Sequence, residues 1–217
     1  MTITALYGFL GLPSDWEFLR RGGFEVVTPD LREIPMEGDT LLGYSLGGRL
    51  ALHALLKGAR YQSAVIVSAG LGVEIDREER LAQDERWASR FEHGEWYVLM
   101  RDWSALPIFG GQAMPRLESD FDRNELARQL REWSPAVLPP VADRLHEITI
   151  PVLWIAGSRD TKYVAEARRA AGLLPNAQLW IAEGAAHRVP WEQPEAFAAR
   201  VREFIAGNKP LSSNGAG

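Results

Sequence analysis

The chain has 217 residues, 46% of them hydrophobic, which is enough to bury one core and fits a single domain. Its formal net charge of −5 at pH 7 argues against binding to nucleic acid, because contacts with phosphate need a basic face. It contains no cysteine, which excludes disulfides and thiolate catalysis and suits the reducing cytosol.

The N-terminal segment shows no sign of targeting. Its apolar stretch has no basic start, and Gly8, Gly11 and Pro13 interrupt it before it could span a membrane or serve in a signal peptide. We therefore expect a cytoplasmic protein with a small-molecule substrate, without nucleic-acid or membrane partners.

Short apolar segments alternate with longer amphipathic ones along most of the chain. This alternation is typical of a parallel sheet with helices on both faces. The predicted strands are Ile3–Tyr7, Glu25–Thr28, Thr40–Tyr44, Ser63–Ser68, Val152–Ala156 and Ala177–Ile181. The predicted helices are Leu46–Leu56, Ala165–Leu173 and Glu195–Ile205. The sequence thus predicts an α/β fold with a mostly parallel sheet of about six strands.

The segment from residue 71 to residue 145 differs from the rest of the chain. It is rich in Arg, Glu and Trp, has helical periodicity and contains no convincing strand. It is too long for one crossover, so we predict a helical cap over the carboxyl ends of the strands. Residues 1–70 and 146–207 then form the α/β core. Residues 208–217, rich in Ser, Gly and Asn, are predicted to be a disordered tail.

The connection between the second and third predicted strands is short. Residues 29–39 include Pro29, Pro35 and Gly38, which break helices. A helix advances only about 1.5 Å per residue, whereas an extended chain advances about 3.3 Å. We therefore predict an extended crossover without a helix. One sheet face beside the third strand would then expose apolar surface, which favours a partner or self-association, as in a homodimer.

The third strand runs into the pattern G-x-S-x-G, with Ser45 between Gly43 and Gly47. A strand before the pattern and a helix after it are typical of a nucleophile on a strained turn, where side chains at the two glycines would collide with neighbouring backbone. A tight βα turn without catalytic function has the same pattern. The flanking elements favour a nucleophile at Ser45.

A serine nucleophile needs a histidine that takes its proton. After such a turn, the acid and then the histidine follow in chain order. His187 lies in a loop between the last strand and the last helix, and Asp160 follows the fifth strand. Asp160 also precedes a helix and could simply be its N-cap. Order and position favour a triad of Ser45, Asp160 and His187.

Backbone amides near Ser45 could bind a developing oxyanion. The loop after the first strand, Gly8 to Gly11, and the residue after the nucleophile can both direct N–H groups toward the site. We predict that the N–H groups of Phe9 and Leu46 form this pair. No pattern in the chain is typical of a metal site.

The segments YGFLG, GYSLGGR, AGSRD and GAAHRVPWEQP together resemble the α/β-hydrolase superfamily across nearly the whole chain. Within that superfamily, GYSLGGR, REERLAQDERWASRF and DWSALPIF resemble the MenH family, the 2-succinyl-6-hydroxy-2,4-cyclohexadiene-1-carboxylate synthases of menaquinone biosynthesis. The chain departs from the usual pattern at Tyr7, which stands where histidine is usual. We also expect this sequence to lack the N-terminal antiparallel hairpin and one crossover helix of that fold.

The resemblance implies a lyase with an α/β-hydrolase fold that needs no cofactor. Such a lyase eliminates pyruvate from 2-succinyl-5-enolpyruvyl-6-hydroxy-3-cyclohexene-1-carboxylate, with the triad acting as base. The resemblance assigns substrate binding to Tyr44, Arg49, Arg80, Trp103 and Arg123. Arginine suits a polycarboxylate, because its planar guanidinium binds carboxylates through two hydrogen bonds.

Two other functions fit the same fold. A carboxylesterase or other hydrolase of small substrates needs the same triad but an apolar pocket, and the arginines of the cap argue against it. A non-catalytic binding protein would be expected to have a broken triad, whereas Ser45, Asp160 and His187 are all present.

Overall fold

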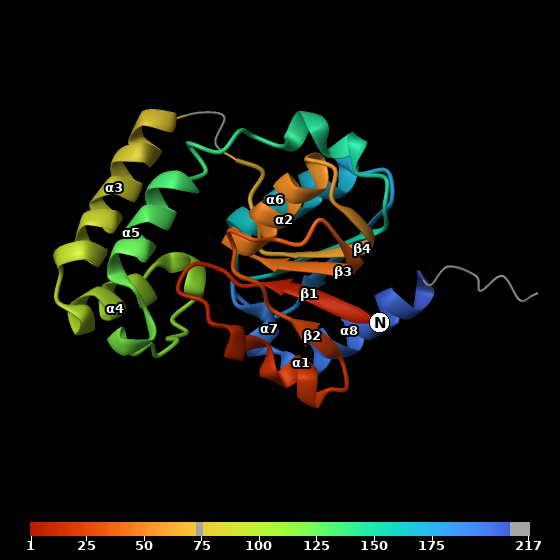
Figure 1. Cartoon of the computed structure of the whole chain (residues 1–217), viewed down its shortest axis with the longest axis horizontal. Coiled ribbons are helices and arrows are strands. Elements are labelled where there is room, and N and C mark those ends of the chain that lie inside the picture. Colours follow the sequence, from red (N-terminus) through yellow and green to blue (C-terminus); the bar gives the residue numbers. More distant parts are fainter. Residues whose placement is uncertain (73–75, 209–217) are drawn as a thin grey trace, which may run out of the picture.

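The computed structural model describes residues 1–72 and 76–208. Its centre is a six-stranded sheet in the order β2-β1-β3-β4-β5-β6, in which every neighbouring pair is parallel (Figure 1). The strands are β1 (Thr2–Leu6), β2 (Glu25–Val27), β3 (Glu37–Tyr44), β4 (Arg60–Val67), β5 (Val152–Gly157) and β6 (Ala177–Ala182). The predicted α/β architecture and its six strands are confirmed.

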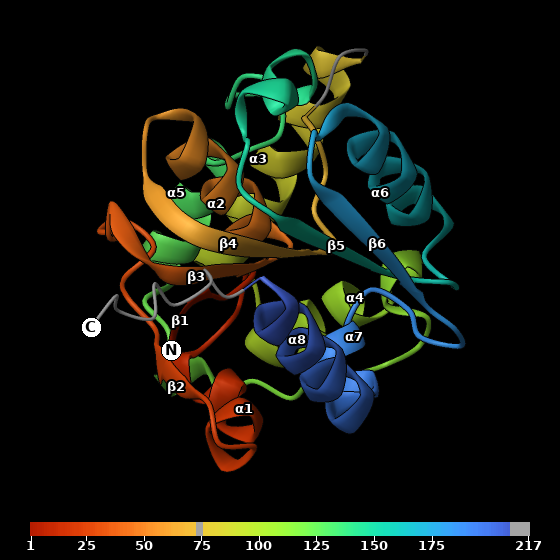
Figure 2. The ribbon, with the colours of Figure 1, turned by 90° about the vertical axis from the view of Figure 1, so that its right-hand side faces the viewer.

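Helices cover both faces of this sheet (Figure 2). One face packs against α2 (Leu46–Leu56), α6 (Thr161–Leu173) and the 3-10 turn η4 (Ala142–Glu147). The other face packs against α1 (Glu17–Arg21), α7 (Val189–Glu192) and α8 (Pro194–Gly207), with the 3-10 turn η1 (Pro13–Trp16) beside α1. None of the helices in the described ranges has the length and apolar character needed to cross a membrane.

The two cores follow from the periodicity of the strands and helices. Along β3, Leu41 faces the first core and Leu42 the second, because successive side chains of a strand point to opposite faces. The apolar stripe of α8, from Phe197 to Ile205, is buried at helical spacing, as the sequence predicted. The sequence did not predict α1, which is short and is packed on the sheet through Leu19, next to the buried Trp16.

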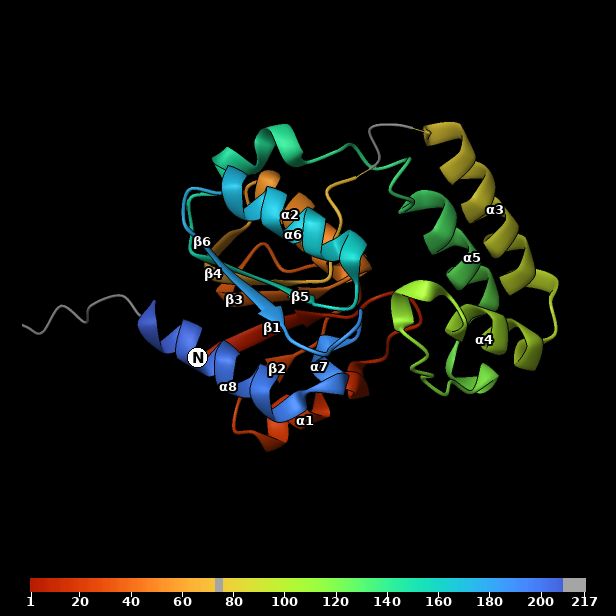
Figure 3. The ribbon, with the colours of Figure 1, turned by 180° about the vertical axis from the view of Figure 1, so that it is seen from behind.

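The segment between β4 and β5 is helical. It contains α3 (Arg77–His93), α4 (Trp96–Ser104), the 3-10 turns η2 (Pro107–Phe109) and η3 (Glu118–Asp120), and α5 (Arg123–Glu132). These helices lie beyond the carboxyl ends of the strands, beside the sheet (Figure 3). They enclose a third apolar cluster around Phe91, Leu99 and Leu126. The end of the segment, Val141 to Leu145, packs into the first core instead.

The predicted tail falls almost wholly outside the described residues, which end at Asn208. The crossover between β2 and β3 is inside them and contains no helix, as expected from its length. It turns once near Leu31, and the Tyr61 hydroxyl donates a hydrogen bond of 2.7 Å to the carbonyl of Pro35.

The expectation of an exposed apolar face beside β3 is wrong for most of that face. Leu6 and Leu41 are fully buried, because Leu31 and Ile34 of the crossover pack into the same cluster and take the place of a helix. Within the described crossover and the edge strand β2, the large exposed apolar side chains are Val27 and Met36. Self-association therefore stays a prediction. The exposed apolar surface at this edge is small and gives it little support.

His53 on α2 makes the stability of the fold dependent on pH. Burial, together with the nearby cations Arg49, Lys57 and Arg144, lowers the pKa of His53 to about 4. The unfolded chain has a histidine pKa of about 6.5. The unfolded state therefore binds a proton before the folded state does, and stability is lost as pH falls from about 6.5 to 4.

We predict that His53→Gln flattens this part of the stability profile by less than about 3.5 kcal/mol, since each pKa unit corresponds to about 1.4 kcal/mol and solvent screens a half-buried group. Urea unfolding at several values between pH 7 and pH 4 measures the effect. His146→Gln removes an exposed histidine and is the matched control. The same pH dependence in His53→Gln and in the wild type would contradict the assignment.

Candidate active site

Ser45 sits on the turn that joins β3 to α2, in a conformation few residues adopt. Its φ of 52° and ψ of −112° lie in a strained region for a residue with a side chain. A Cβ at Gly47 would lie 2.4 Å from the carbonyl oxygen of Tyr7, and one at Gly43 would lie 2.5 Å from that of Gly47. Glycine at both positions lets α2 approach the sheet and presents the Ser45 hydroxyl at the carboxyl end of β3.

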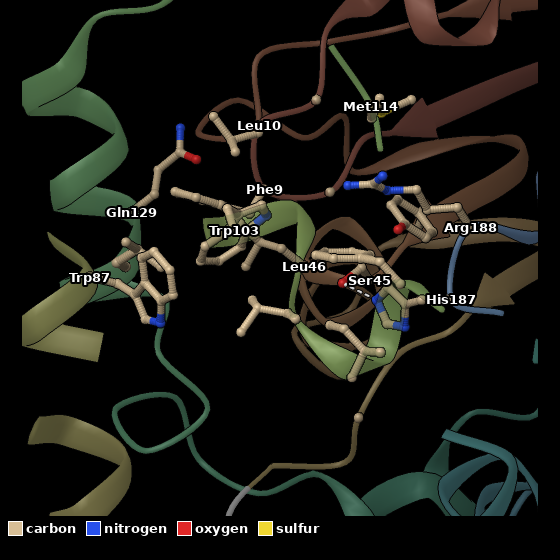
Figure 4. Close-up of a pocket in the computed structure, with 18 of the residues that line it drawn as sticks. Phe9, Leu10, Ser45, Leu46, Trp87, Trp103, Met114, Gln129, His187 and Arg188 are labelled. Carbon is tan, nitrogen blue, oxygen red and sulfur yellow. Dashed lines mark hydrogen bonds between the residues drawn. The ribbon is translucent and has the colours of Figure 1, made fainter. Parts of the chain in front are cut away.

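His187 reaches Ser45 from the loop between β6 and α7. Its Nε2 lies 3.0 Å from the Ser45 Oγ (Figure 4). Its Nδ1 lies 2.6 Å from an oxygen of Asp160. The imidazole is 1% exposed, and the rings of Tyr44, Phe109 and Tyr163 surround it. The structure thus brings the three predicted triad residues into one hydrogen-bonded chain.

Asp160 uses both carboxylate oxygens. Oδ2 pairs with His187, while Oδ1 accepts a hydrogen bond from the Tyr163 N–H and caps α6. The sequence left open whether this residue is a helix cap or the acid of a triad. In the structure it makes both contacts, one through each carboxylate oxygen. The cap holds the carboxylate in the orientation that suits the imidazole.

A close approach at Gly157 sets the position of the histidine loop. A Cβ there would lie 2.0 Å from the carbonyl oxygen of Ala186, so only glycine allows the loop to pack against the end of β5. The His187 N–H donates to the carbonyl of Ile108, which ties the same loop to the segment after α4.

The loop between β1 and η1 forms the wall opposite the start of α2. It turns tightly, with a hydrogen bond of 2.9 Å from the Gly11 N–H to the Gly8 carbonyl and with Leu10 at a φ of 59°. Phe9 and Leu46 both line the cavity beside Ser45 (Figure 4). Among the described residues, neither backbone N–H has a hydrogen-bond acceptor, so both can serve a ligand.

Ser45 opens into a cavity of about 360 Å³ between the core and the cap. Aromatic side chains from both parts line it: Phe9, Tyr44, Trp87, Trp103, Phe109, Trp133, Tyr163 and Trp191. In the described part of the chain, no cluster of three or more His, Asp or Glu side chains is placed to hold a metal ion.

The cavity is positively charged within an acidic protein. Among the described residues, the side chains that line it include five cations, Arg49, Arg80, Arg116, Lys162 and Arg188, and two anions, Asp15 and Asp84. Arg80 pairs with Asp84, and Arg116 pairs with Asp15. Among the described residues, the other three cations have no carboxylate within ion-pair distance. The cavity therefore suits a ligand with several negative charges.

Arg49 is a cation that the fold buries at this cavity. It is 6% exposed, and burial lowers the pKa of its guanidinium to about 10, helped by the nearby Arg80. Among the described residues, its donors reach the carbonyls of Trp133 and Ser134, at 3.4 and 3.5 Å, and no carboxylate. The group stays protonated at pH 7, and a buried cation without a carboxylate partner is costly unless a ligand compensates its charge.

Comparison with known proteins agrees with this geometry. Residues 6–200 match the model of the α/β hydrolase family. Proteins named 2-succinyl-6-hydroxy-2,4-cyclohexadiene-1-carboxylate synthase, from Salmonella paratyphi A and Serratia proteamaculans, are 33% identical over 76% of this chain and 67% of their own length. The chain belongs to the α/β-hydrolase family and, within it, to the MenH family.

Solved structures show the same fold. The structure of MenH from S. aureus matches with a TM-score of 0.85 and 23% identity, covering 97% of this chain and 95% of that one. A hydrolase from Pseudomonas aeruginosa matches with a TM-score of 0.73 and 19% identity, covering 94% and 89%. This chain is therefore an enzyme with the α/β-hydrolase fold.

The structure places four of the five residues that the MenH resemblance assigned to substrate binding in the cavity: Tyr44, Arg49, Arg80 and Trp103. Arg123 does not line it, so that assignment is wrong. Its Nε donates to the carbonyl of Phe91, and its guanidinium pairs with Glu118. It begins α5 and fastens that helix to the end of α3.

Sequence reasoning missed several cavity residues, among them Arg116, Lys162, Tyr163 and Arg188. Arg188 directly follows His187, and Tyr163 lies three residues after Asp160, so proximity to the triad could have indicated both. Arg116 comes from the connection between η2 and η3, where no local pattern marks it. Tyr44 lies beside Arg188, and burial raises the pKa of its phenol well above the usual value, so it stays protonated.

We predict that phenylmethylsulfonyl fluoride labels Ser45, because His187 can take the hydroxyl proton during attack. Mass spectrometry should find one sulfonylated serine, and Ser45→Ala should abolish labelling. His187→Gln should slow it by at least about 100-fold. Ser104 lines the same cavity but makes no hydrogen bond with Asp160 or His187, so Ser104→Ala is the control and should be labelled at the wild-type rate. Labelling of the Ser45→Ala variant would contradict the assignment of Ser45 as the nucleophile.

Proposed function

We propose that this protein is a lyase of menaquinone biosynthesis that eliminates pyruvate from 2-succinyl-5-enolpyruvyl-6-hydroxy-3-cyclohexene-1-carboxylate. The observation that carries the proposal is the charge of the cavity. Arg49, Lys162 and Arg188 lack carboxylate partners among the described residues, and they line the space over Ser45. The substrate has carboxylates on its ring, its succinyl group and its enolpyruvyl group. The names of the similar proteins support the same reaction.

In the proposed reaction, Asp160 holds the imidazole of His187 in the tautomer that leaves Nε2 free to accept a proton. His187 takes the proton of Ser45, whose oxygen removes the proton from C2 of the ring. The C–H electron pair forms the C2–C3 double bond, the ring double bond moves to C4–C5, and the C5–O bond breaks. Pyruvate leaves as its enolate and is protonated by the returning proton. The product is the 2,4-diene.

The first step places negative charge on an oxygen, because C2 lies next to the succinyl ketone. The backbone N–H groups of Phe9 and Leu46 are the proposed donors to that oxyanion. Fixed donors of this kind stabilise a developing charge without reorganising, and loss of one typically costs about 100-fold or more in rate. The reaction uses only groups of this chain.

We predict that Ser45→Ala lowers the rate of pyruvate release by at least about 1,000-fold, since the base and its relay are lost together. Pyruvate can be followed through lactate dehydrogenase and NADH, starting from the pathway intermediate. A short p-nitrophenyl ester tests the carboxylesterase alternative in parallel. Fast ester hydrolysis without pyruvate release would favour the esterase. Absence of both activities would favour a binding protein on the same fold.

We also predict that Arg80→Met raises KM about 10- to 100-fold, the loss expected for a charge-assisted hydrogen bond of about 1.5–3 kcal/mol. The thermal unfolding midpoint should stay close to that of the wild type. Arg86 is exposed on the same helix and does not line the cavity, so Arg86→Met is the matched control for lost charge. Equal effects of the two variants on KM would remove the support for a polycarboxylate substrate.

A further inference from the structure

Arg188 is a buried cation whose position beside the triad calls for a function. It is 7% exposed, and burial lowers the pKa of its guanidinium. Its Nη1 donates a hydrogen bond of 2.6 Å to the carbonyl of Gln112, and its Cζ lies 4.0 Å from the centroid of the Phe109 ring, with the Tyr44 phenol nearby. These are neutral groups. Within the described residues no carboxylate forms an ion pair with the Arg188 guanidinium, and the side chain lines the cavity beside Ser45.

This charge is separate from the one formed by Arg49 and Arg80. Arg80 and Asp84 of the cap lie close enough to Arg49 of α2 to shift the pKa of its guanidinium, Arg80 downward and Asp84 upward. The electrostatic neighbours of Arg188 are instead Tyr44, Arg116 and Glu192. Figure 4 shows Arg188 on the His187 side of Ser45 and near Met114, away from Trp87 of α3 and Gln129 of α5. Arg188 and the pair of Arg49 and Arg80 therefore line the same cavity with different hydrogen-bond partners, the carbonyl of Gln112 for the first and groups of the segment 84–134 for the other two.

We propose that Arg188 forms a second anion-binding subsite, which takes one carboxylate of a polycarboxylate ligand while Arg49 and Arg80 take another. A guanidinium on an aromatic face, with one edge held by a carbonyl, presents its other donors in a fixed direction, as carboxylate recognition requires. The subsite adds to the proposed function and rests on it for the identity of the ligand, though the binding of a carboxylate is testable on its own.

A purely structural role is the competing explanation. The segment from Pro107 to Gln112 crosses the site and is held by Arg188 at Gln112 and by Arg159 at Gly110, 2.8 Å from the carbonyl oxygen. Arg159 fastens this segment as Arg188 does, but it is exposed and does not line the cavity. Arg159→Met therefore removes the same charge and the same kind of support without touching the subsite.

The test is isothermal titration calorimetry of the full chain with tricarballylate, a flexible tricarboxylate. We expect Arg188→Met to weaken binding about 10- to 100-fold, from the loss of a charge-assisted hydrogen bond. Arg159→Met should stay within about two-fold of the wild type. Arg188→Lys should recover part of the affinity, because it retains the charge but not the planar guanidinium. Unfolding midpoints establish that each variant is folded.

Three results would overturn the subsite: no measurable binding of tricarballylate to the wild type, equal loss in Arg188→Met and Arg159→Met, or no loss in Arg188→Met. Pyruvate release by the wild type separates the two proposals. If the wild type releases no pyruvate but binds tricarballylate through Arg188, the proposed reaction fails and the subsite stands. If it releases pyruvate and Arg188→Met binds tricarballylate normally, the subsite alone fails.

Discussion

The active centre depends on how closely backbone can approach backbone around Ser45. The serine holds a positive φ because β3 must end and α2 must begin within one residue, and the absence of Cβ atoms at Gly43 and Gly47 makes room for the helix. α2 then packs against the end of β1, near the Tyr7 carbonyl. Its first turn, which carries the positive end of the helix dipole, points into the cavity with the N–H of Leu46. The strain is stored at the position where chemistry takes place.

The same constraint operates a second time, at Gly157. There the loop that carries His187 packs on the end of β5 at a distance that no side chain would permit. The parallel sheet brings the carboxyl ends of β3, β5 and β6 to one edge, so residues separated by more than a hundred positions meet in one hydrogen-bonded chain. The strand order of the sheet and the close approaches at the glycines thus explain why Ser45, Asp160 and His187 lie together.

The cap adds charge that the core alone could not hold. Arg49 belongs to the core helix α2, yet its guanidinium contacts carbonyls at the end of α5, and Arg80 on α3 is oriented by Asp84. The extended crossover helps to hold the cap in place, since Arg32 forms ion pairs with Glu125 and Glu132 of α5. Buried cations that exceed their carboxylate partners reduce the stability of the empty protein, and a ligand with several carboxylates would recover that energy.

Local pattern was sufficient for much of the fold. The apolar segments that became β1 to β6, the helix Leu46–Leu56 and the order of Ser45, Asp160 and His187 could all be predicted, because strand and helix periodicity and the G-x-S-x-G turn act over a few residues. The lack of a helix between β2 and β3 followed from chain length and from its prolines.

Only the tertiary structure decided where long side chains point. Leu31 and Ile34 fill the place of the missing helix, Arg123 turns to the carbonyl of Phe91 instead of the cavity, and Arg188 turns into it. No periodicity encodes these directions, because they depend on partners that are distant in sequence and on which carbonyls and carboxylates remain unpaired after the elements have packed. The sequence by itself determined the sheet, its nucleophile turn and the order of the triad. The packing of cap on core determined which charges face the ligand.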